Sequence, residues 1–210
     1  MNEVMLNTVD KIHIDILREI ANIGSGNAIT SLAEMLDKKI DMSVPNVKVV
    51  HFKDLAESLG GAENIILATL VAISGDISGM MMFIVTQNSA ISLLESLGQC
   101  PENIKSLESV TKEQLQSINE VGKILTGSYL KSLTMLTGKH IEPFEPMFAI
   151  DMANAVLSVP AIEFGKMSDQ ILLIESVFGA GSDKQDVSGY FLLLPDMLSF
   201  KKIFQALEVM

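Results

Sequence analysis

A carboxylate and a carboxamide, Glu19 and Asn22, stand three positions apart near the start of the chain, and a further carboxylate, Asp15, precedes them. An ionised carboxylate only accepts hydrogen bonds, so Glu19 suits a salt bridge to a cation. A carboxamide both accepts and donates, so Asn22 can orient a polar molecule. On a helix, residues three apart project side by side, so the two groups could act on the same partner.

The same pattern occurs a second time with one change that matters chemically. The two copies are Asp15, Glu19, Asn22 and Pro45, then Gln116, Glu120, Lys123 and Pro146. The glutamates and the prolines each keep a spacing of 101 positions, whereas Lys123 stands in place of Asn22. An ammonium group is donor-only, so the second copy keeps a docking glutamate and loses the acceptor. The pattern therefore predicts a two-site protein with one working site.

The two halves predict the same series of elements: a long helix, three strands and a closing helix. In the first half these are residues 8–37, 47–52, 65–73, 77–86 and 88–97. In the second half the long helix is 111–137, the strands are 148–150, 169–174 and 187–193, and the closing helix is 196–207. Asn88 and Asp196 are the predicted N-caps of the closing helices. A short capped helix is predicted from Asp151.

This order predicts an α+β fold: one internally duplicated, pseudo-twofold sandwich in which two long helices pack on a continuous, mainly antiparallel sheet. We interpret the chain as a single domain built from two repeats, about 8–98 and 111–208. At 100° per residue, four isoleucines form the stripe expected to pack on the sheet: Ile12, Ile16, Ile20 and Ile23. Within about 60° of one another, at the opposite edge of that stripe, lie Asp15, Glu19, Asn22 and Gly26.

The bulk composition limits the classes of partner. Of 210 residues, 48% are hydrophobic and 20% charged, as in an ordinary globular chain. A net charge of −11 repels nucleic acid and anionic membrane, so neither is expected as a partner. The single cysteine, Cys100, excludes an internal disulfide and fits the cytoplasm, and the histidines have no metal-ligand spacing, so no metal site is expected. Ser128 and Tyr129 are interpreted as packing residues. Since the twofold seam is internal, we expect a monomer.

The wider context of the pair is specific, although the pair alone arises by chance in roughly half of chains of this length. The segment DILREIANIGSGNA, which starts at Asp15, is followed by SVPNV, and 22 residues separate Asn22 from Pro45. This spacing resembles the signature of the CheC family of bacterial chemotaxis, in which Asp or Ser, Glu, Asn and Pro occur at these intervals. The resemblance covers essentially the whole chain, including the duplication and the stretch Ile150-Asp151-Met152.

Proteins of the CheC family are phosphatases of the phosphorylated response regulator CheY, and the resemblance implies that activity here. The substrate would be an acyl phosphate on an aspartate of the partner, with Mg²⁺ held by the partner and no cofactor in this chain. Asn22 would orient the attacking water, and Glu19 would form a salt bridge with a lysine of the receiver domain. Asp15 would make a supporting contact, and Pro45 would shape the helix-to-strand junction.

The resemblance also implies a second partner. The stretch around Asp151 resembles the surface on which CheC proteins bind CheD, a receptor-modifying glutamine deamidase, and Asp151 is the expected contact. Two alternatives remain open. One is a non-catalytic scaffold of the FliM type, which shares the fold and lacks the motif. The other is a regulator whose main output is the sequestering of CheD.

Overall fold

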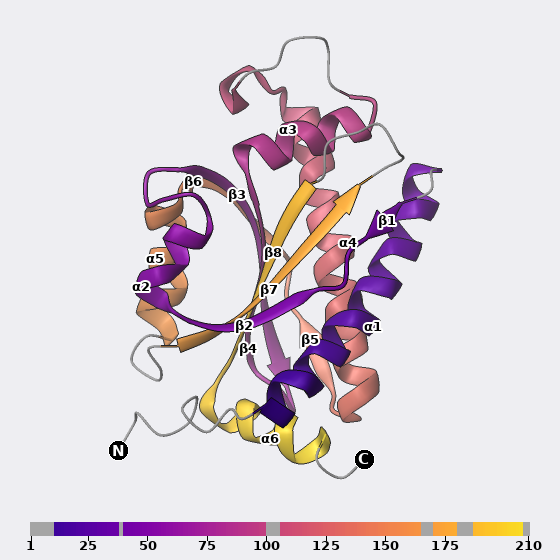
Figure 1. Ribbon diagram of the computed structural model, residues 1–210, viewed down its shortest axis with the longest axis vertical. Helices are drawn as coiled ribbons and strands as arrows, with labels where there is room; N and C mark the ends of the chain where they lie inside the picture. The colour runs from indigo at the N-terminus through magenta and orange to yellow at the C-terminus, as the bar shows by residue number, and fades with distance from the viewer. Residues whose placement is uncertain (1–10, 38–39, 100–105, 165–169, 180–186, 208–210) are drawn as a thin grey trace.

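The structure, a computed structural model, describes residues 11–37, 40–99, 106–164, 170–179 and 187–207 (Figure 1). The first half comprises α1 (Lys11–Leu36), β1 (Asp41–Met42), β2 (Asn46–His51), α2 (Phe52–Ser58), β3 (Ile65–Gly75), β4 (Gly79–Thr86) and α3 (Gln87–Ser96). After a short 3-10 helix, η1 (Leu107–Ser109), the second half comprises α4 (Lys112–Thr137), β5 (Ile141–Pro143), β6 (Met147–Met152), α5 (Ala153–Phe164), β7 (Gln170–Gly179), β8 (Val187–Pro195) and α6 (Met197–Leu207). The two halves therefore repeat the same order of elements, and α1 and α4 are both 26 residues long.

Eight strands of the described chain form one sheet with antiparallel pairings. Its order is β1-β7-β8-β4-β3-β5, with β2 also beside β7 and β6 also beside β3. The central pair joins the halves, since β4 of the first half lies beside β8 of the second. The edges are exchanged: β1 and β2 pair with β7, whereas β5 and β6 pair with β3. Each half thus completes the sheet of the other, and the predicted fold with a continuous, mainly antiparallel sheet is confirmed.

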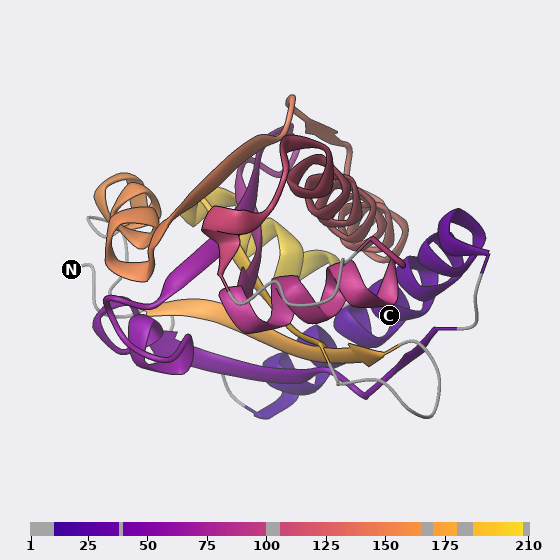
Figure 2. The ribbon, with the colours of Figure 1, turned by 90° about the horizontal axis from the view of Figure 1, so that it is seen from above.

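Helices cover both faces of the sheet (Figures 1 and 2). α1 and α4 lie on one side, and α2 and α5 lie on the other. Successive strand residues point to opposite faces, so the sheet supplies two cores. Phe83 and Phe191 belong to the core with α1 and α4, while Met82 and Leu192 belong to the core with α2 and α5. Because both faces are covered, β4 is buried at six consecutive positions, which explains why it is a continuous apolar run.

α1 packs chiefly against α4 and only in part against the sheet. The buried face of α1 consists of small and apolar residues: Leu17, Ile20, Ala21, Gly24, Ser25, Ala28 and Leu32. The predicted isoleucine stripe was therefore partly wrong: Ile20 is buried, but Ile16 and Ile23 are half-buried, and the side chain of Ile12 is not among those described. Small residues let two helices approach closely, so the contact with α4, rather than side-chain hydrophobicity, sets the rotation of α1.

Most of the predicted boundaries are confirmed to within a few residues, including those of α4. Asp196 is confirmed as the N-cap of α6, because its Oδ1 accepts a hydrogen bond of 2.7 Å from the backbone N–H of Ser199. The predicted N-cap of α3, Asn88, was wrong. The side chain of Thr86 accepts from the backbone N–H of Ser89 instead. Thr86 is also the last residue of β4, so one residue serves both elements.

Some helices and strands of the structure were not predicted from the sequence. α2, β1 and β5 are only two to seven residues long, too short for a hydrophobic period to be recognised. The helix predicted from Asp151 begins at Ala153 as α5, and Asp151 itself lies in β6. Cys100 lies outside the described residues. Among the helices that are described, none is both long and apolar enough to cross a membrane.

Candidate functional site

The motif residues of the first repeat form one outward surface of α1. We call this surface the motif face; it consists of Asp15, Glu19, Asn22 and Gly26. At 100° per residue its centre is roughly 150° away from the centre of the buried face of α1. Asp15, Glu19 and Gly26 are exposed, and Asn22 is half-buried. The carboxylate and the carboxamide are therefore presented together on the side of the helix that faces away from α4.

The two central groups of the motif face are not engaged by the rest of the described chain. Asp15 is paired with its neighbour on the helix, since Arg18 Nη1 lies 2.7 Å from Asp15 Oδ1. For Glu19 and Asn22, no side-chain hydrogen bond or ion pair to another described residue is found. These two side chains are consequently available to an incoming molecule, whereas Asp15 already has a partner.

The second repeat presents an equivalent surface on α4, which we call the second motif face; it consists of Gln116, Glu120, Lys123 and Gly127. Here the two central groups are engaged with each other, because Lys123 Nζ donates to Glu120 Oε1 at 3.0 Å. Both side chains are partly exposed, and such a pair stabilises a helix by only about 0.3–0.5 kcal/mol. An incoming cation could displace Lys123 at that cost, so the ion pair alone would not close the surface. The missing acceptor is the larger chemical defect.

The two prolines of the pattern occupy equivalent places in the sheet. Pro45 is buried between β1 and β2, and Pro146 is half-buried immediately before β6. Pro45 was predicted to shape the helix-to-strand junction; it lies instead at the junction of two strands, because β1 stands between α1 and this proline. Proline has no N–H to donate to a sheet, so it separates the short strand from the longer one that follows.

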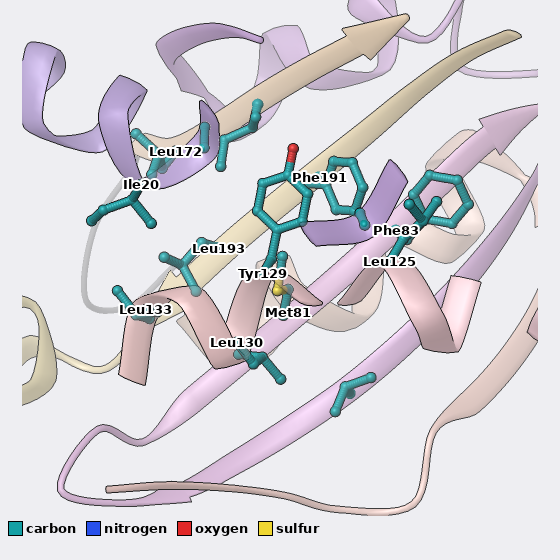
Figure 3. Packing of buried hydrophobic residues seen from close by; sticks show 14 of the residues in the cluster. Ile20, Met81, Phe83, Leu125, Tyr129, Leu130, Leu133, Leu172, Phe191 and Leu193 are labelled. Atoms are coloured by element: carbon teal, nitrogen blue, oxygen red, sulfur yellow. The ribbon is translucent and has the colours of Figure 1, made fainter. Parts of the chain in front are cut away.

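A buried polar junction fixes α1 against α4 and the sheet. Ser25 Oγ donates to the carbonyl of Ala21 at 2.7 Å, which uses its only proton, so the hydroxyl of Tyr129 donates to Ser25 Oγ at 2.6 Å. Ser176 Oγ of β7 in turn donates to the Tyr129 hydroxyl at 3.2 Å. Burial raises the pKa of Tyr129, although its hydrogen bonds with Ser176 and Ser25 oppose that shift. The ring stacks on Phe191 at a centroid distance of 4.3 Å (Figure 3).

Further polar contacts complete the support of both motif faces. Asn27 Nδ2 of α1 donates to Ser132 Oγ of α4 at 3.0 Å. Thr69 Oγ1 of β3 donates to Asn119 Oδ1, the residue before Glu120, at 3.2 Å. The interpretation of Tyr129 as a packing residue is confirmed, but its hydrogen-bonded partners were missed. The signal that could have found them is the series of small residues on α1 at intervals of three and four.

Asp151, the remaining candidate, lies on a different element from either motif face. It is exposed on β6, and its Oδ1 accepts from the backbone N–H of Met152 at 2.7 Å. In the described sheet β6 pairs with β3 alone, so its other edge is unpaired. Met147, Ile150 and Met152 of the same strand are exposed by 58%, 37% and 49%. An acidic residue and exposed apolar side chains thus lie on the same edge strand of the sheet.

Comparison with known proteins identifies the class to which this fold and motif belong. The model of the CheC-like family matches residues 12–49, the segment that contains Glu19, Asn22 and Pro45. The chain is also 32% identical, over 205 residues, to the CheY-P phosphatase CheC of Bacillus subtilis (strain 168), and the match covers 97% of each protein. The chain therefore belongs to the CheC-like family.

Solved structures show the same fold at low sequence identity. FliY of Thermotoga maritima superimposes with a TM-score of 0.74 and 19% identity, covering 96% of this chain and 98% of that one. CheX of Borrelia burgdorferi, solved in complex with CheY, BeF₃ and Mg²⁺, superimposes with a TM-score of 0.51 and 16% identity over 87% of this chain and 98% of that one. At these identities the likeness establishes the fold.

Proposed function

We propose that this chain hydrolyses the aspartyl phosphate of the chemotaxis response regulator CheY, using the motif face of α1. The observation that carries the proposal is the side-by-side presentation of Glu19 and Asn22 on an outward helix surface, where neither is engaged by another described residue. The relative with 32% identity is named as a CheY-P phosphatase, which supports the same reaction class. CheX, which shares the fold, was solved in complex with CheY, which supports a receiver domain as the carrier of the phosphoryl group.

The reaction replaces one oxygen on phosphorus by another. The bond between phosphorus and the aspartyl oxygen breaks, the oxygen of a water molecule binds to phosphorus, and the products are inorganic phosphate and the free carboxylate of the receiver. Asn22 Oδ1 accepts a hydrogen bond from the attacking water and holds it in line, while the amide NH₂ remains able to donate. Phosphoryl transfer depends mainly on such positioning and on charge neutralisation. Mg²⁺ belongs to the receiver, where it would neutralise the phosphoryl oxygens.

Glu19 has a different role from Asn22. As an ionised carboxylate it forms a salt bridge with a lysine of the receiver and so aligns α1 with the phosphorylated aspartate. Asp15, already paired with Arg18, makes at most a supporting contact with the partner. The second motif face lacks an acceptor at Lys123, so hydrolysis runs on the first repeat.

The test is the decay of purified, phosphorylated CheY in the presence of increasing amounts of the chain. The proposal expects acceleration that saturates with CheY. Glu19→Ala should raise KM with a smaller effect on kcat, because it removes docking, while Asn22→Ala should lower kcat with little change in KM. No acceleration at any concentration of the chain would refute the catalytic proposal and favour a non-catalytic scaffold of the FliM type.

We further propose CheD as a second partner, which binds at Asp151 on β6. The exposed apolar residues Met147, Ile150 and Met152 and the unpaired strand edge support a protein contact there. Asp151→Lys should weaken the complex with purified CheD, and wild-type affinity in this variant would remove Asp151 from the contact. If CheD binds while CheY phosphate decays at its own rate, sequestering of CheD is the main output.

A further inference from the structure

Four glycines lie inside the two long helices, where glycine is disfavoured because it gives the unfolded chain more conformational freedom than any other residue. Two of them are explained by packing within the chain. A Cβ added to Gly24 would lie 2.8 Å from Tyr129 Cδ1, so α1 could not approach α4 as it does. A Cβ added to Gly122 would collide with the side chain of Thr69, so this glycine lets α4 lie on β3.

Gly26 and Gly127 have no such explanation. Both are exposed, and a Cβ added to either would meet no atom of the described residues within 4 Å. Neither has a positive φ, so the backbone does not require glycine either. Alanine at either position would favour the helix and touch nothing. A glycine inside a helix with no reason in its own fold calls for a reason outside it.

The helix surface carries little side-chain bulk at the turn of α1 that contains Gly26. Gly26 lies four residues after Asn22, so it is one turn further along the motif face. Its two neighbours turn inward: Ser25 bonds with Tyr129, and Asn27 bonds with Ser132. At this turn α1 therefore presents its backbone and the hydroxyl of Thr30, which donates to the carbonyl of Gly26 at 3.0 Å.

An aspartyl phosphate as substrate requires a close approach of the receiver backbone to that turn. Its phosphoryl group is joined to the receiver backbone by a single short side chain. When Asn22 is within hydrogen-bond reach of the attacking water, the receiver backbone must lie about one side-chain length from α1. A flexible ligand free in solution would impose no such closeness.

We propose that Gly26 is a specificity-determining position, at which the backbone of the phosphorylated receiver closes on α1 beside Asn22. The inference rests on the proposed function and adds a steric limit to it. Any side chain at position 26 would hold the receiver away from Asn22. Gly127 stands 101 positions after Gly26, the spacing of the repeat, and has the same place relative to Lys123 on α4. It provides a matched control, because no hydrolysis is assigned to that face.

The test compares Gly26→Ala with Gly127→Ala. Since each alanine should strengthen its helix without a clash, the melting temperature should rise by about 2–4 °C in both variants, which shows that both fold. Gly26→Ala should raise KM for phosphorylated CheY, and the Kd for CheY loaded with BeF₃ and Mg²⁺, by about tenfold or more. Gly127→Ala should leave both constants within about twofold of wild type.

Two results would overturn the inference. One is a wild-type KM and Kd in Gly26→Ala, and the other is an equal rise in both glycine variants. Asn22→Ala separates this failure from a failure of the proposed function. If Asn22→Ala abolishes turnover while Gly26→Ala changes nothing, only the steric inference is wrong. If Asn22→Ala leaves turnover intact, the proposed function itself is wrong.

Discussion

Replacing Tyr129 by phenylalanine tests how the helix that carries the motif face is held in place. The substitution keeps the ring and its stacking on Phe191 but removes the hydroxyl that links α1, α4 and β7. Two hydrogen bonds are lost, each worth about 1 kcal/mol net, and Ser176 is left with a buried hydroxyl that has lost its acceptor. Ser25 keeps its bond to Ala21. We therefore expect the free energy of unfolding to fall by about 2–3 kcal/mol.

Urea denaturation followed by circular dichroism measures this loss directly, with an unchanged m-value if the denatured state is unaffected. The melting temperature should fall by about 4–12 °C for a chain of this size. Tyr190→Phe is the matched control: Tyr190 is half-buried on β8, has no hydrogen bond to another described residue through its hydroxyl, and should change stability by less than about 0.5 kcal/mol. If Tyr129→Phe is as stable as Tyr190→Phe, the hydroxyl junction contributes nothing and the account of how α1 is fixed is wrong.

Two further predictions concern the second motif face and the pH dependence of stability. Asn22→Ala alone should lower turnover by about 10²–10³-fold. In that background, Lys123→Asn should raise activity again by about tenfold or more, since it supplies the missing acceptor on α4. An unchanged decay rate of phosphorylated CheY would show that other features also disable the second motif face. Burial raises the pKa of Tyr129 and, together with the charge of Glu175, that of Tyr190 above the ordinary value of 10.0. The unfolded chain therefore loses these protons at a lower pH than the folded chain does. The contribution of the two tyrosines to the free energy of unfolding should be complete below pH 10 and should fall as the pH rises through their raised pKa values in the folded chain. A tyrosinate absorbance titration of the folded chain should have its midpoint above 10.

Much of the architecture could be predicted because matching residues of the two repeats occur at a fixed spacing of 101 positions. A helix of 26 residues has about seven turns, over which apolar residues recur every three to four positions, so α1 and α4 were recognisable. Asp196 was recognisable as a cap because its side chain accepts a hydrogen bond from the first turn of the helix that it precedes. These are local properties, and each depends on residues close together in the sequence.

The rotation of α1 could not be predicted in the same way. Large isoleucines suggested a stripe on the sheet, but Gly24 packs so near the ring of Tyr129, 105 positions later, that an added Cβ would lie 2.8 Å from Cδ1. Likewise, the hydroxyl of Tyr129 meets Ser176 on another element. Such contacts depend on which helix lies beside which, and that arrangement follows from the sheet in which β2 of one repeat pairs with β7 of the other. Sequence periodicity carries no information on that exchange.

The position of the motif face was predicted more accurately than its support. Asp15, Glu19 and Asn22 do share one side of α1, as 100° per residue requires. That Asp15 is held by Arg18, and Lys123 by Glu120, depends on side-chain conformations that spacing permits but does not select.

The central claim is that hydrolysis depends on a single carboxamide, Asn22 of the first repeat, which positions the attacking water. It is tested most directly by Asn22→Ala and Lys123→Ala in parallel. Both residues are half-buried at equivalent turns of equal helices, so the two truncations are matched in structure and differ in chemistry. The measurement is the rate at which phosphorylated CheY decays with each variant at saturating substrate. We predict that Asn22→Ala lowers the rate by about 10²–10³-fold and that Lys123→Ala stays within about twofold of wild type. Undiminished decay with Asn22→Ala, or an equal loss with Lys123→Ala, would contradict the account.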